Sequence, residues 1–370
     1  MLHNSSTRTQ IATNVEKILA RFDQKSALIW DEKGGLEGSW LWNDAQDTIY
    51  ATSDRRLDDI LHIFHKEWHG IRAAAGSLPG RKLAIPEVNL STDRLNVLAL
   101  EIQDRNPSRI IFHGYSSNMG ALIKWFHHVG LSEKVYLIFH GSPAQWWNDI
   151  ERKYVFDMIR LAQNGLIHRV HIMKRGMELP GVRLFSPLLY NISPNHSHAE
   201  LEIGRSDCVS AFVPGWGNWI KNVFGSALGA SLSENVDEVW AFAEGLQLPN
   251  PLNEKLLILK PTDRQETFRR YLSSHLTLNV SLIDCHPMVN VESQSLGRPC
   301  VRADLNLDAF EDHEYVKIVN VGHNNSPADI RNAVDRTLSV PKLEMKDMLA
   351  DYQSKIDQIS IERYIDFLKI

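Results

Sequence analysis

The stretch SLIDCHPMVNVESQSLGRPCV at residues 281–301 carries the clearest fold signal in this chain. Its pattern predicts a strand that ends at Asp284, a helix that begins near Pro287, and a second strand after Pro299. Proline suits the first turn of a helix, where its missing N–H group would have no intrahelical partner, and Gly297 suits the helix exit. Strand, helix and strand in this order form the unit that builds parallel sheets.

Strands and helices alternate in the same way over most of the chain. We expect strands at 26–30, 82–88, 109–114, 135–142, 167–173, 182–189, 209–215, 236–243, 256–261, 277–284, 299–305 and 315–321, and helices at 8–22, 54–75, 93–104, 117–129, 145–164, 218–230, 263–275, 288–297 and from about 326. Strands that are apolar nearly throughout and separated by helices are typical of parallel sheets covered on both faces. We therefore predict an α/β fold of two Rossmann-like, doubly wound lobes that face a cleft.

The length of the chain predicts two domains. Its 370 residues exceed the size at which a single hydrophobic core usually keeps growing. A polar stretch at 190–207 interrupts the alternation of strands and helices. We therefore place an N-terminal lobe at residues 1–205 and a C-terminal lobe at 206–349, and the closing segment, 343–370, has helical periodicity.

The composition argues against several classes of protein. Hydrophobic residues make up 43% and charged residues 23% of the chain, which are ordinary globular values. The formal charge of -5 argues against a protein that coats nucleic acid. Three cysteines without CxxC spacing predict neither a disulfide framework nor a zinc site. Because the sequence shows no signal peptide and no apolar run of spanning length, we expect a cytoplasmic protein, with peripheral contact at the inner membrane face left open.

The acidic residues of the opening stretch resemble a motif of the retaining GT-B glycosyltransferases. That family has an acidic residue after a strand, a turn with proline, a second acidic residue eight positions on, and a helix that ends in Gly-x-Pro. Asp284 and Glu292 have this spacing, and Pro287, Gly297 and Pro299 occupy the matching places. This chain has Asp at the first position, where Glu is usual. The alternative is that Asp284 caps the helix and Glu292 is solvated.

The resemblance implies a site for a nucleotide-sugar donor in the C-terminal lobe. Asp284 would contact the sugar hydroxyls there, and Glu292 would contact the ribose. The N–H groups at the start of the helix favour the donor diphosphate, which adds Pro287, Met288 and Val289 to the donor-binding residues.

The donor diphosphate also requires cations, because an enzyme that uses no metal ion must balance the leaving-group charge in another way. The resemblance places Lys260 and Arg264 against the diphosphate. In the loop at 213–222, Gly215 and Lys221 are further donor-binding residues, and the alternative is an ordinary loop between a strand and a helix. We expect no cofactor and no structural metal ion.

Histidine and glycine follow two predicted strands of the N-terminal lobe. RIIFHG ends with His113 and Gly114, and VYLIFHGS brings His140 and Gly141 to the presumed cleft. By the resemblance, a histidine near the reacting sugar falls at such a position, and we assign it to His140. The alternative is a satisfied turn residue. We assign Gly114, Gly141 and Arg72 to the acceptor site.

The segment HKEWHGIRAAAGSLPGRK at 65–82 has two histidines one helical turn apart. It is not HExxH, so it predicts no zinc ion. Its glycine-rich part, 76–80, together with Arg72, Arg81 and Lys82, predicts a mobile loop that meets the acceptor or a membrane surface. A plain solvated loop is the alternative.

We therefore predict a glycosyltransferase that moves a sugar from a nucleotide-sugar to an acceptor with retention of configuration, with Asp284, His140 and Lys260 in catalysis. The acceptor stays open between a saccharide, a lipid-linked molecule and a nucleic acid, and the resemblance favours surface polysaccharide or glycoconjugate synthesis. It also implies that the last helix, 350–370, packs back on the first lobe. A nucleotide-sugar epimerase and a non-catalytic nucleotide-binding relative are the alternatives.

Overall fold

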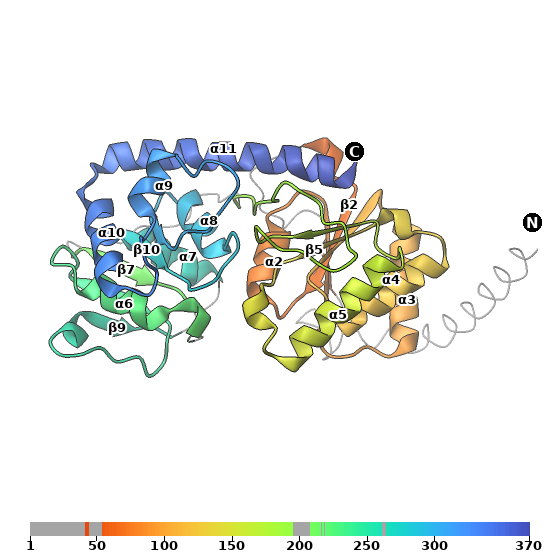
Figure 1. The fold of residues 1–370 in the computed structure, drawn as a ribbon, viewed down its shortest axis with the longest axis horizontal. Coiled ribbons are helices and arrows are strands. Elements are labelled where there is room, and N and C mark those ends of the chain that lie inside the picture. Colours follow the sequence, from red (N-terminus) through yellow and green to blue (C-terminus); the bar gives the residue numbers. More distant parts are fainter. Residues whose placement is uncertain (1–40, 44–53, 195–207, 216, 218, 261–263) are drawn as a thin grey trace, which may run out of the picture.

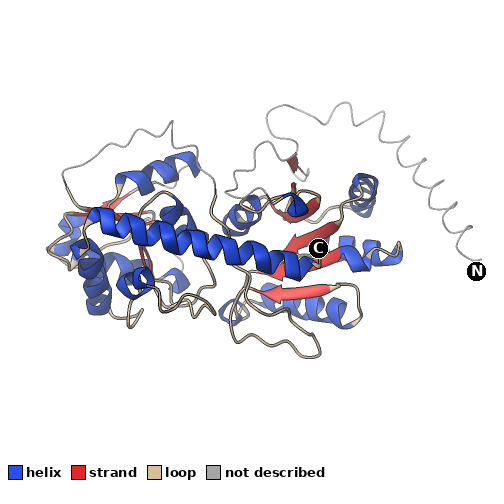
Figure 2. Ribbon diagram, turned by 90° about the horizontal axis from the view of Figure 1, so that it is seen from above, coloured by secondary structure: helices blue, strands red, loops and turns tan. Residues whose placement is uncertain are grey.

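The computed structural model describes residues 41–43, 54–194, 208–215, 217, 219–260 and 264–370, and every structural statement below concerns these residues. Two α/β lobes lie side by side, and one long helix, α11 (Lys342–Leu368), runs across both of them (Figures 1 and 2).

The first lobe is built on a six-stranded sheet in the order β1-β3-β2-β4-β5-β6. β1 is antiparallel to β3, and the other five strands are parallel. The elements are β1 (Leu41–Asn43), η1 (Arg55–Leu57), β2 (Ile60–His65), α2 (His69–Gly76), β3 (Arg81–Ile85), α3 (Thr92–Arg105), β4 (Arg109–His113), α4 (Ser117–His128), η2 (Ser132–Lys134), β5 (Val135–Phe139), η3 (Pro143–Gln145), α5 (Asp149–Gln163) and β6 (Arg169–Ile172).

The second lobe is built on a five-stranded parallel sheet in the order β11-β10-β7-β8-β9. Its elements are β7 (Ser210–Val213), η5 (Trp219–Lys221), α6 (Val223–Ser231), β8 (Glu238–Ala241), η6 (Leu252–Lys255), β9 (Leu256–Ile258), α7 (Arg264–Ser273), β10 (Leu276–Asn279), α8 (Met288–Ser295), β11 (Cys300–Arg302), α9 (Glu314–Val319) and α10 (Pro327–Ser339). The predicted pair of doubly wound parallel sheets is thus confirmed.

Short polar side chains fix where several helices begin. Ser91 caps α3 by accepting the N–H of Arg94, and Ser326 caps α10 by accepting the N–H of Asp329. Such caps satisfy N–H groups that have no intrahelical partner, and each stabilises a helix by about 1 kcal/mol. The helices therefore start at defined residues, which sets the loops between strand and helix.

Each sheet contains a point where its strand order reverses. In the first sheet, the chain passes from β2 outward to β3 and then returns to place β4 on the other side of β2. In the second sheet, β8 and β9 follow β7 on one side, and β10 lies on the other. Ligands of doubly wound sheets bind beyond the carboxyl ends of the strands at these reversals. The loops after β2, β4, β7 and β10 are therefore the places to look for a site.

Helix α11 joins the cores of the two lobes. Its last turns bury Tyr364, Phe367 and Leu368 against the first lobe, and Tyr136 Oη of β5 donates to the carbonyl of Leu368 over 3.1 Å. Its earlier turns pack Met345 and other residues against α9 of the second lobe. Both lobes thus make apolar contacts with the same helix, which connects them.

Three predicted elements are wrong. Residues 54–75 contain the buried strand β2 and two short helical segments, because a short, mostly apolar run such as ILHIFH does not distinguish a buried strand from a helix. Residues 182–189 make only isolated bridges, from Val182 to Leu179 and from Leu184 to Val170, and Pro187, which lacks an N–H group, suits such irregular structure. Residues 315–321 contain most of helix α9, whose first turn His313 caps.

The predicted helix at 8–22, the predicted strand at 26–30 and the domain boundary at 205/206 lie outside the described residues.

Candidate functional site

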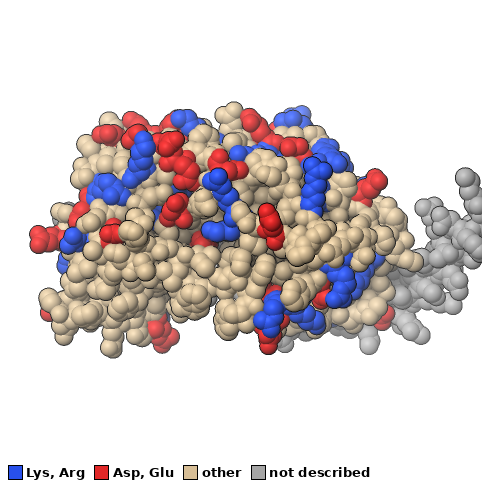
Figure 3. Space-filling view, viewed as in Figure 1, with Lys and Arg blue, Asp and Glu red and all other residues tan. Residues whose placement is uncertain are grey.

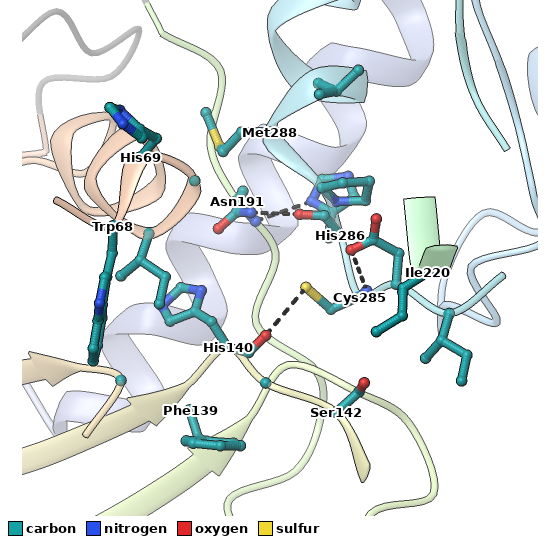
Figure 4. Close-up of a pocket in the computed structure, with 18 of the residues that line it drawn as sticks. Trp68, His69, Phe139, His140, Ser142, Asn191, Ile220, Cys285, His286 and Met288 are labelled. Carbon is teal, nitrogen blue, oxygen red and sulfur yellow. Dashed lines mark hydrogen bonds between the residues drawn. The ribbon is translucent and has the colours of Figure 1, made fainter. Parts of the chain in front are cut away.

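A cavity of about 440 Å³ lies where the carboxyl ends of the two sheets face each other. Its walls are the loops after β2, β4 and β5 of the first lobe and the loops after β7 and β10 of the second, so it includes both strand reversals (Figure 4). The lining residues are Trp68, His69, Gly70, Ile71, Gly114, Tyr115, Phe139, His140, Gly141, Ser142, Glu151, Asn191, Ile220, Lys221, Ile283, Asp284, Cys285, His286, Pro287, Met288 and Val289.

An ion pair forms the polar centre of the second-lobe wall. Lys221 Nζ lies 2.8 Å from Asp284 Oδ2, to which Ser281 Oγ also donates over 3.0 Å. The backbone N–H of Cys285 donates to the other carboxylate oxygen over 3.1 Å. Burial acts to lower the pKa of Lys221, but the Asp284 carboxylate outweighs it, so the pKa lies above its ordinary value. Lys221 therefore stays a cation beside the cavity.

The first turn of α8 borders the same wall. Pro287 occupies the N-cap position, and no side chain caps the helix there. The N–H groups of Met288 and Val289 have no intrahelical acceptor, and both residues line the cavity. The partial positive charge of a helix N-terminus adds to that of Lys221, so this part of the cavity suits an anionic group.

The first-lobe wall is partly aromatic, and its one described acidic residue is Glu151 of α5, whose pKa burial raises. Gly114 has φ +83°, and a Cβ atom there would lie 2.7 Å from Cζ3 of Trp68, so only glycine allows this indole ring its place. The ring of Trp68 also packs against His65 with centroids 4.3 Å apart. Burial, followed by the charge of His171, lowers the pKa of His140 to about 3. His140 is thus a neutral imidazole in the wall.

Hydrogen bonds join the two lobes around the cavity. Lys174 Nζ, just after β6, donates to the backbone carbonyl of Asp284 over 2.6 Å. The backbone N–H of Asn191 donates to His286 Nδ1 over 3.0 Å, and its amide nitrogen donates to the carbonyl of His286 over 2.5 Å (Figure 4). The loop from Asp284 to His286 is therefore positioned by first-lobe residues as well as by its own strand.

The structure brings most of the predicted site residues to this cavity. From the second lobe, Asp284, Pro287, Met288, Val289 and Lys221 line it, and from the first lobe His140, Gly114 and Gly141 do so. Residues from two sheets, such as His140 and Asp284, which are 144 positions apart in the sequence, thus meet in one cavity.

Lys260 is placed differently from the prediction. It follows β9, the edge strand, and is exposed, while β8 and β7 separate that strand from β10. Lys221, which follows β7, is the cation that reaches Asp284 instead. Arg264 begins α7, and its side chain is outside the described part. A position after a strand does not reveal that strand's place in the sheet, which explains the difference.

Three more predicted residues lie outside the cavity lining. Glu292 is buried on α8, about one turn beyond Met288, with 8% of its surface exposed. A Cβ atom at Gly215 would lie 2.9 Å from Cγ2 of Val223, so glycine is needed there for packing. Arg72 is exposed, and its guanidinium donates to the carbonyl of Lys66 over 2.8 Å.

The predicted mobile loop at 76–80 is packed into the first lobe. Ser77, Leu78, Pro79 and Gly80 are buried. Lys82, expected on the surface, is only 2% exposed, and its Nζ donates to two backbone carbonyls over 2.7 Å each. The prediction failed because glycine, proline and lysine are typical of surface loops, and only the packing around them shows that these are buried.

The sequence reasoning missed several cavity residues, among them Trp68, Asn191 and His286. Asn191 lies in the polar stretch at 190–207, which indicates the domain boundary, so its position gave no functional signal. His286 is part of the opening motif, between the acid and the proline, and could have been singled out there. Burial lowers its pKa to about 3, so it too is neutral.

The surface charges, the metal-ligating side chains and the helices add three observations. Acidic and basic side chains are intermixed on the face that Figure 3 shows, and few of either kind occur on its lower left part. Within the described ranges, no group of three or more His, Cys, Asp or Glu side chains is arranged to hold a metal ion. Among the described helices, none combines the length and the apolar character needed to cross a membrane.

Comparison with known proteins gives matches in structure but not in sequence. No family model matches the chain. No curated protein matches it either. The trehalose-6-phosphate structure from E. coli, bound with UDP-2-fluoro glucose, matches with a TM-score of 0.56 at 11% identity, over 84% of this chain and 99% of that one.

Two further structures match at similar levels. Sucrose-phosphate synthase from Thermosynechococcus elongatus has a TM-score of 0.53 at 11% identity, over 78% of this chain and 84% of that one. The UDP-forming α,α-trehalose-phosphate synthase from Burkholderia xenovorans, in complex with glucose-6-phosphate, has a TM-score of 0.51 at 10% identity, over 79% of this chain and 88% of that one. Since these identities show similarity of fold alone, the conclusion is that this chain has the GT-B fold of the retaining glycosyltransferases.

Proposed function

We propose that this protein is a glycosyltransferase that moves a sugar from a nucleotide-sugar donor to an acceptor with retention of configuration. One observation carries the proposal: the cavity joins a second-lobe wall with a lysine and a helix N-terminus to a partly aromatic first-lobe wall, which no described Lys or Arg lines. A charged donor and an uncharged reacting hydroxyl need such different surroundings.

The donor diphosphate would lie against the start of α8 and Lys221. The N–H groups of Met288 and Val289 offer hydrogen bonds, and Lys221 offers a full positive charge. Both stabilise the charge that develops as the sugar–phosphate bond breaks. The sequence analysis assigned this role to Lys260, and we propose it for Lys221 instead.

Asp284 would orient the transferred sugar. Its Oδ2 is held by Lys221 and Ser281 in the structure, and a diphosphate that attracts Lys221 leaves that oxygen to accept a sugar hydroxyl. Glu292, deeper on α8, would contact the nucleotide ribose after a small movement of the helix start. Orientation of the reacting groups in this way is itself a large part of enzymatic rate enhancement.

The acceptor would lie against the first-lobe wall, which Trp68, Gly114 and Gly141 line. Aromatic rings offer an apolar face for a sugar ring. One of the matched structures holds UDP-2-fluoro glucose and another holds glucose-6-phosphate, which makes uridine diphosphate sugars the first donors to test and sugar phosphates the first acceptors. Lipid-linked, polysaccharide and nucleic-acid acceptors belong in the same screen.

The test is a two-step screen with purified protein. Thermal denaturation with a panel of nucleotide diphosphates and nucleotide-sugars first identifies the donor, because a ligand that binds only the folded state raises its stability. Incubation of that donor with an acceptor panel then identifies the product, and NMR of the new anomeric centre shows whether the donor configuration is kept. Inversion would refute the proposed stereochemistry.

Two other outcomes would replace the proposal. Conversion of the nucleotide-sugar to its epimer without an acceptor would show an epimerase on this fold. The second outcome is that the protein binds the donor tightly and shows no turnover with any acceptor of the panel. If Lys221→Met also left donor binding unchanged, this result would indicate a non-catalytic nucleotide-binding protein.

A further inference from the structure

Three histidines from neighbouring strands form a hydrogen-bonded row that ends at the cavity. His62 Nδ1 lies 2.9 Å from His113 Nε2, and His113 Nδ1 lies 3.1 Å from His140 Nε2. The rings come from β2, from the end of β4 and from the residue after β5, which are adjacent in the sheet. His62 and His113 are 2% and 0% exposed, so two of the three members are internal.

The inner end of the row fixes the direction of its hydrogen bonds. His62 Nε2 lies 2.8 Å from the carbonyl oxygen of Pro79, and a carbonyl only accepts, so Nε2 carries the proton. A neutral imidazole has one N–H, so His62 Nδ1 must accept from His113 Nε2. By the same step, His113 Nδ1 accepts from Nε2 of His140. His140 Nδ1 is then left unprotonated.

This assignment requires that all three rings are neutral. Burial, aided for His62 by the charge of Lys82, holds the pKa of His62 and of His113 well below the ordinary value. Among the described residues, no carboxylate accepts a hydrogen bond from any of these three rings. An imidazolium in the row would therefore have no hydrogen-bonded counter-charge. Burying an unpaired charge is costly, which favours the neutral row.

The carbonyl at the inner end is held firmly in place. Lys82 Nζ donates to the carbonyls of Leu78 and Gly80, on either side of Pro79, over 2.7 Å each. Gly80 has φ +104°, and a Cβ atom there would lie 2.6 Å from the carbonyl oxygen of Ile60. The loop therefore presents the Pro79 carbonyl to His62 in one orientation.

The outer end of the row opens on the cavity. His140 lines it, and its ring lies between Trp68 and Cys285 in Figure 4. No described residue makes a hydrogen bond to His140 Nδ1, and this nitrogen is not among the buried polar atoms that lack a partner. It is therefore accessible from the cavity.

From this geometry we propose that His62 and His113 are positioning residues that hold His140 in one tautomer, with an unprotonated Nδ1 presented to the cavity. His140 then accepts a hydrogen bond from a substrate hydroxyl and has no proton to donate to a phosphate oxygen. The consequence for specificity rests on the proposed function, whereas the tautomer of the row does not. His140 selects a sugar that carries a hydroxyl at the contacting position over its deoxy or fluoro analogue.

The tautomer can be measured on the whole protein without any substrate. We would label histidine with ¹⁵N and record long-range ¹H–¹⁵N correlation spectra at neutral pH, which distinguish the two neutral tautomers and the imidazolium. Signals are assigned by their loss in His62→Gln, His113→Gln and His140→Gln. We expect all three rings as Nε2–H tautomers. An Nδ1–H tautomer or an imidazolium at His140 would overturn the proposal, whether or not the protein transfers sugar.

The positioning role needs a second readout. His113→Leu removes both ring nitrogens and should lower kcat/KM by about tenfold, the effect of one lost hydrogen bond in the transition state, while the His140 signal shifts toward a mixture of tautomers. His113→Gln, whose amide keeps one donor and one acceptor, should recover most of that loss. His127→Leu, on the exposed end of α4, serves as the matched control and should leave kcat/KM unchanged.

Two results decide against this role. Unchanged kcat/KM in His113→Leu, with the row present in the wild-type spectrum, would show that the row is structural only. An equal loss in His113→Leu and His113→Gln would show damage by any substitution at that position. If His113→Leu does not fold, His62→Leu, one ring further from the cavity, tests the same prediction.

Discussion

The two walls of the cavity differ in how they handle ionisable groups. The second-lobe wall keeps a full ion pair, Lys221 with Asp284, and the Asp284 side chain is 11% exposed. The first-lobe wall buries bases that burial keeps neutral, His140 at the cavity and His113 behind it. Burial in a protein shifts a base toward its neutral form unless an opposite charge lies close by, and only the second lobe supplies that partner. The difference suits one wall to a diphosphate and the other to hydroxyl groups.

The largest test of this contrast removes the cation. Lys221→Met should lower turnover about 10²- to 10³-fold, the usual effect of losing one group that stabilises developing charge. It also leaves the Asp284 carboxylate unpaired near the diphosphate, which adds repulsion. Steady-state kinetics with the donor found in the screen measures the effect. The exposed Lys317→Met on α9 is the control, and equal activity in both variants would remove Lys221 from the mechanism.

The second test asks whether burial in the first lobe lowers the pKa of Lys82 toward neutral pH. Burial lowers the pKa of Lys82 from 10.5 to about 7, so the unfolded chain binds a proton between those values that the folded protein does not. The contribution of Lys82 to the free energy of unfolding should therefore rise as the pH increases from about 7 toward 10.5, by a few kcal/mol at most.

The measurement for Lys82 is the unfolding free energy of the wild type minus that of Lys82→Met, followed across this pH range. The subtraction removes the titration of all other groups. We expect the difference to grow with pH, and a flat difference would mean that Lys82 remains charged in the folded protein through its bonds to the two carbonyls.

The third test separates backbone strain from contact in the first-lobe wall. Gly114→Ala places a Cβ atom against Trp68 at φ +83°, whereas Gly130→Ala places one at φ +79° with no atom within 4 Å. Both variants should lose about 1–3 kcal/mol from strain, and Gly114→Ala should lose more because the indole ring must move. Thermal denaturation of the two variants gives the comparison. Equal losses would show that the Trp68 ring moves away without cost.

The smallest expected effect is at Lys260. This residue is exposed at the edge of the second sheet, away from the cavity. Lys260→Ala should change turnover by less than about twofold, as is usual for surface substitutions outside a site. A loss comparable to that of Lys221→Met would restore the role that the sequence motif suggested for Lys260.

Much of the architecture could be predicted from the sequence. The alternation of apolar strands with helices gave two doubly wound sheets, and the motif from Asp284 to Pro299 gave a helix start at the cavity. These features are local, since they depend on residues within one strand, turn and helix. The errors at 54–75 and 315–321 are also local, because short apolar runs fit a buried strand and a buried helix equally well.

The site itself was only partly predictable. Asp284 and His140 could be named because each follows a strand, and a carboxyl-end loop is where such sheets bind ligands. Lys221 and Lys260 also follow strands, and only the order β10-β7-β8-β9 decides which of them approaches Asp284. Strand order depends on packing between residues far apart in the chain, so sequence spacing does not contain it.

The sequence by itself determined the fold class, the placement of the helix start at Pro287 and the acids beside it, because these follow from apolar periodicity and turn chemistry over short distances. The tertiary structure alone decided that Lys82 is buried, that Lys221 pairs with Asp284, and that histidines from three strands form one row. The physical reason is that burial and charge pairing depend on the neighbours a residue acquires on folding, and Lys221 and Asp284, for example, are 63 positions apart in the chain.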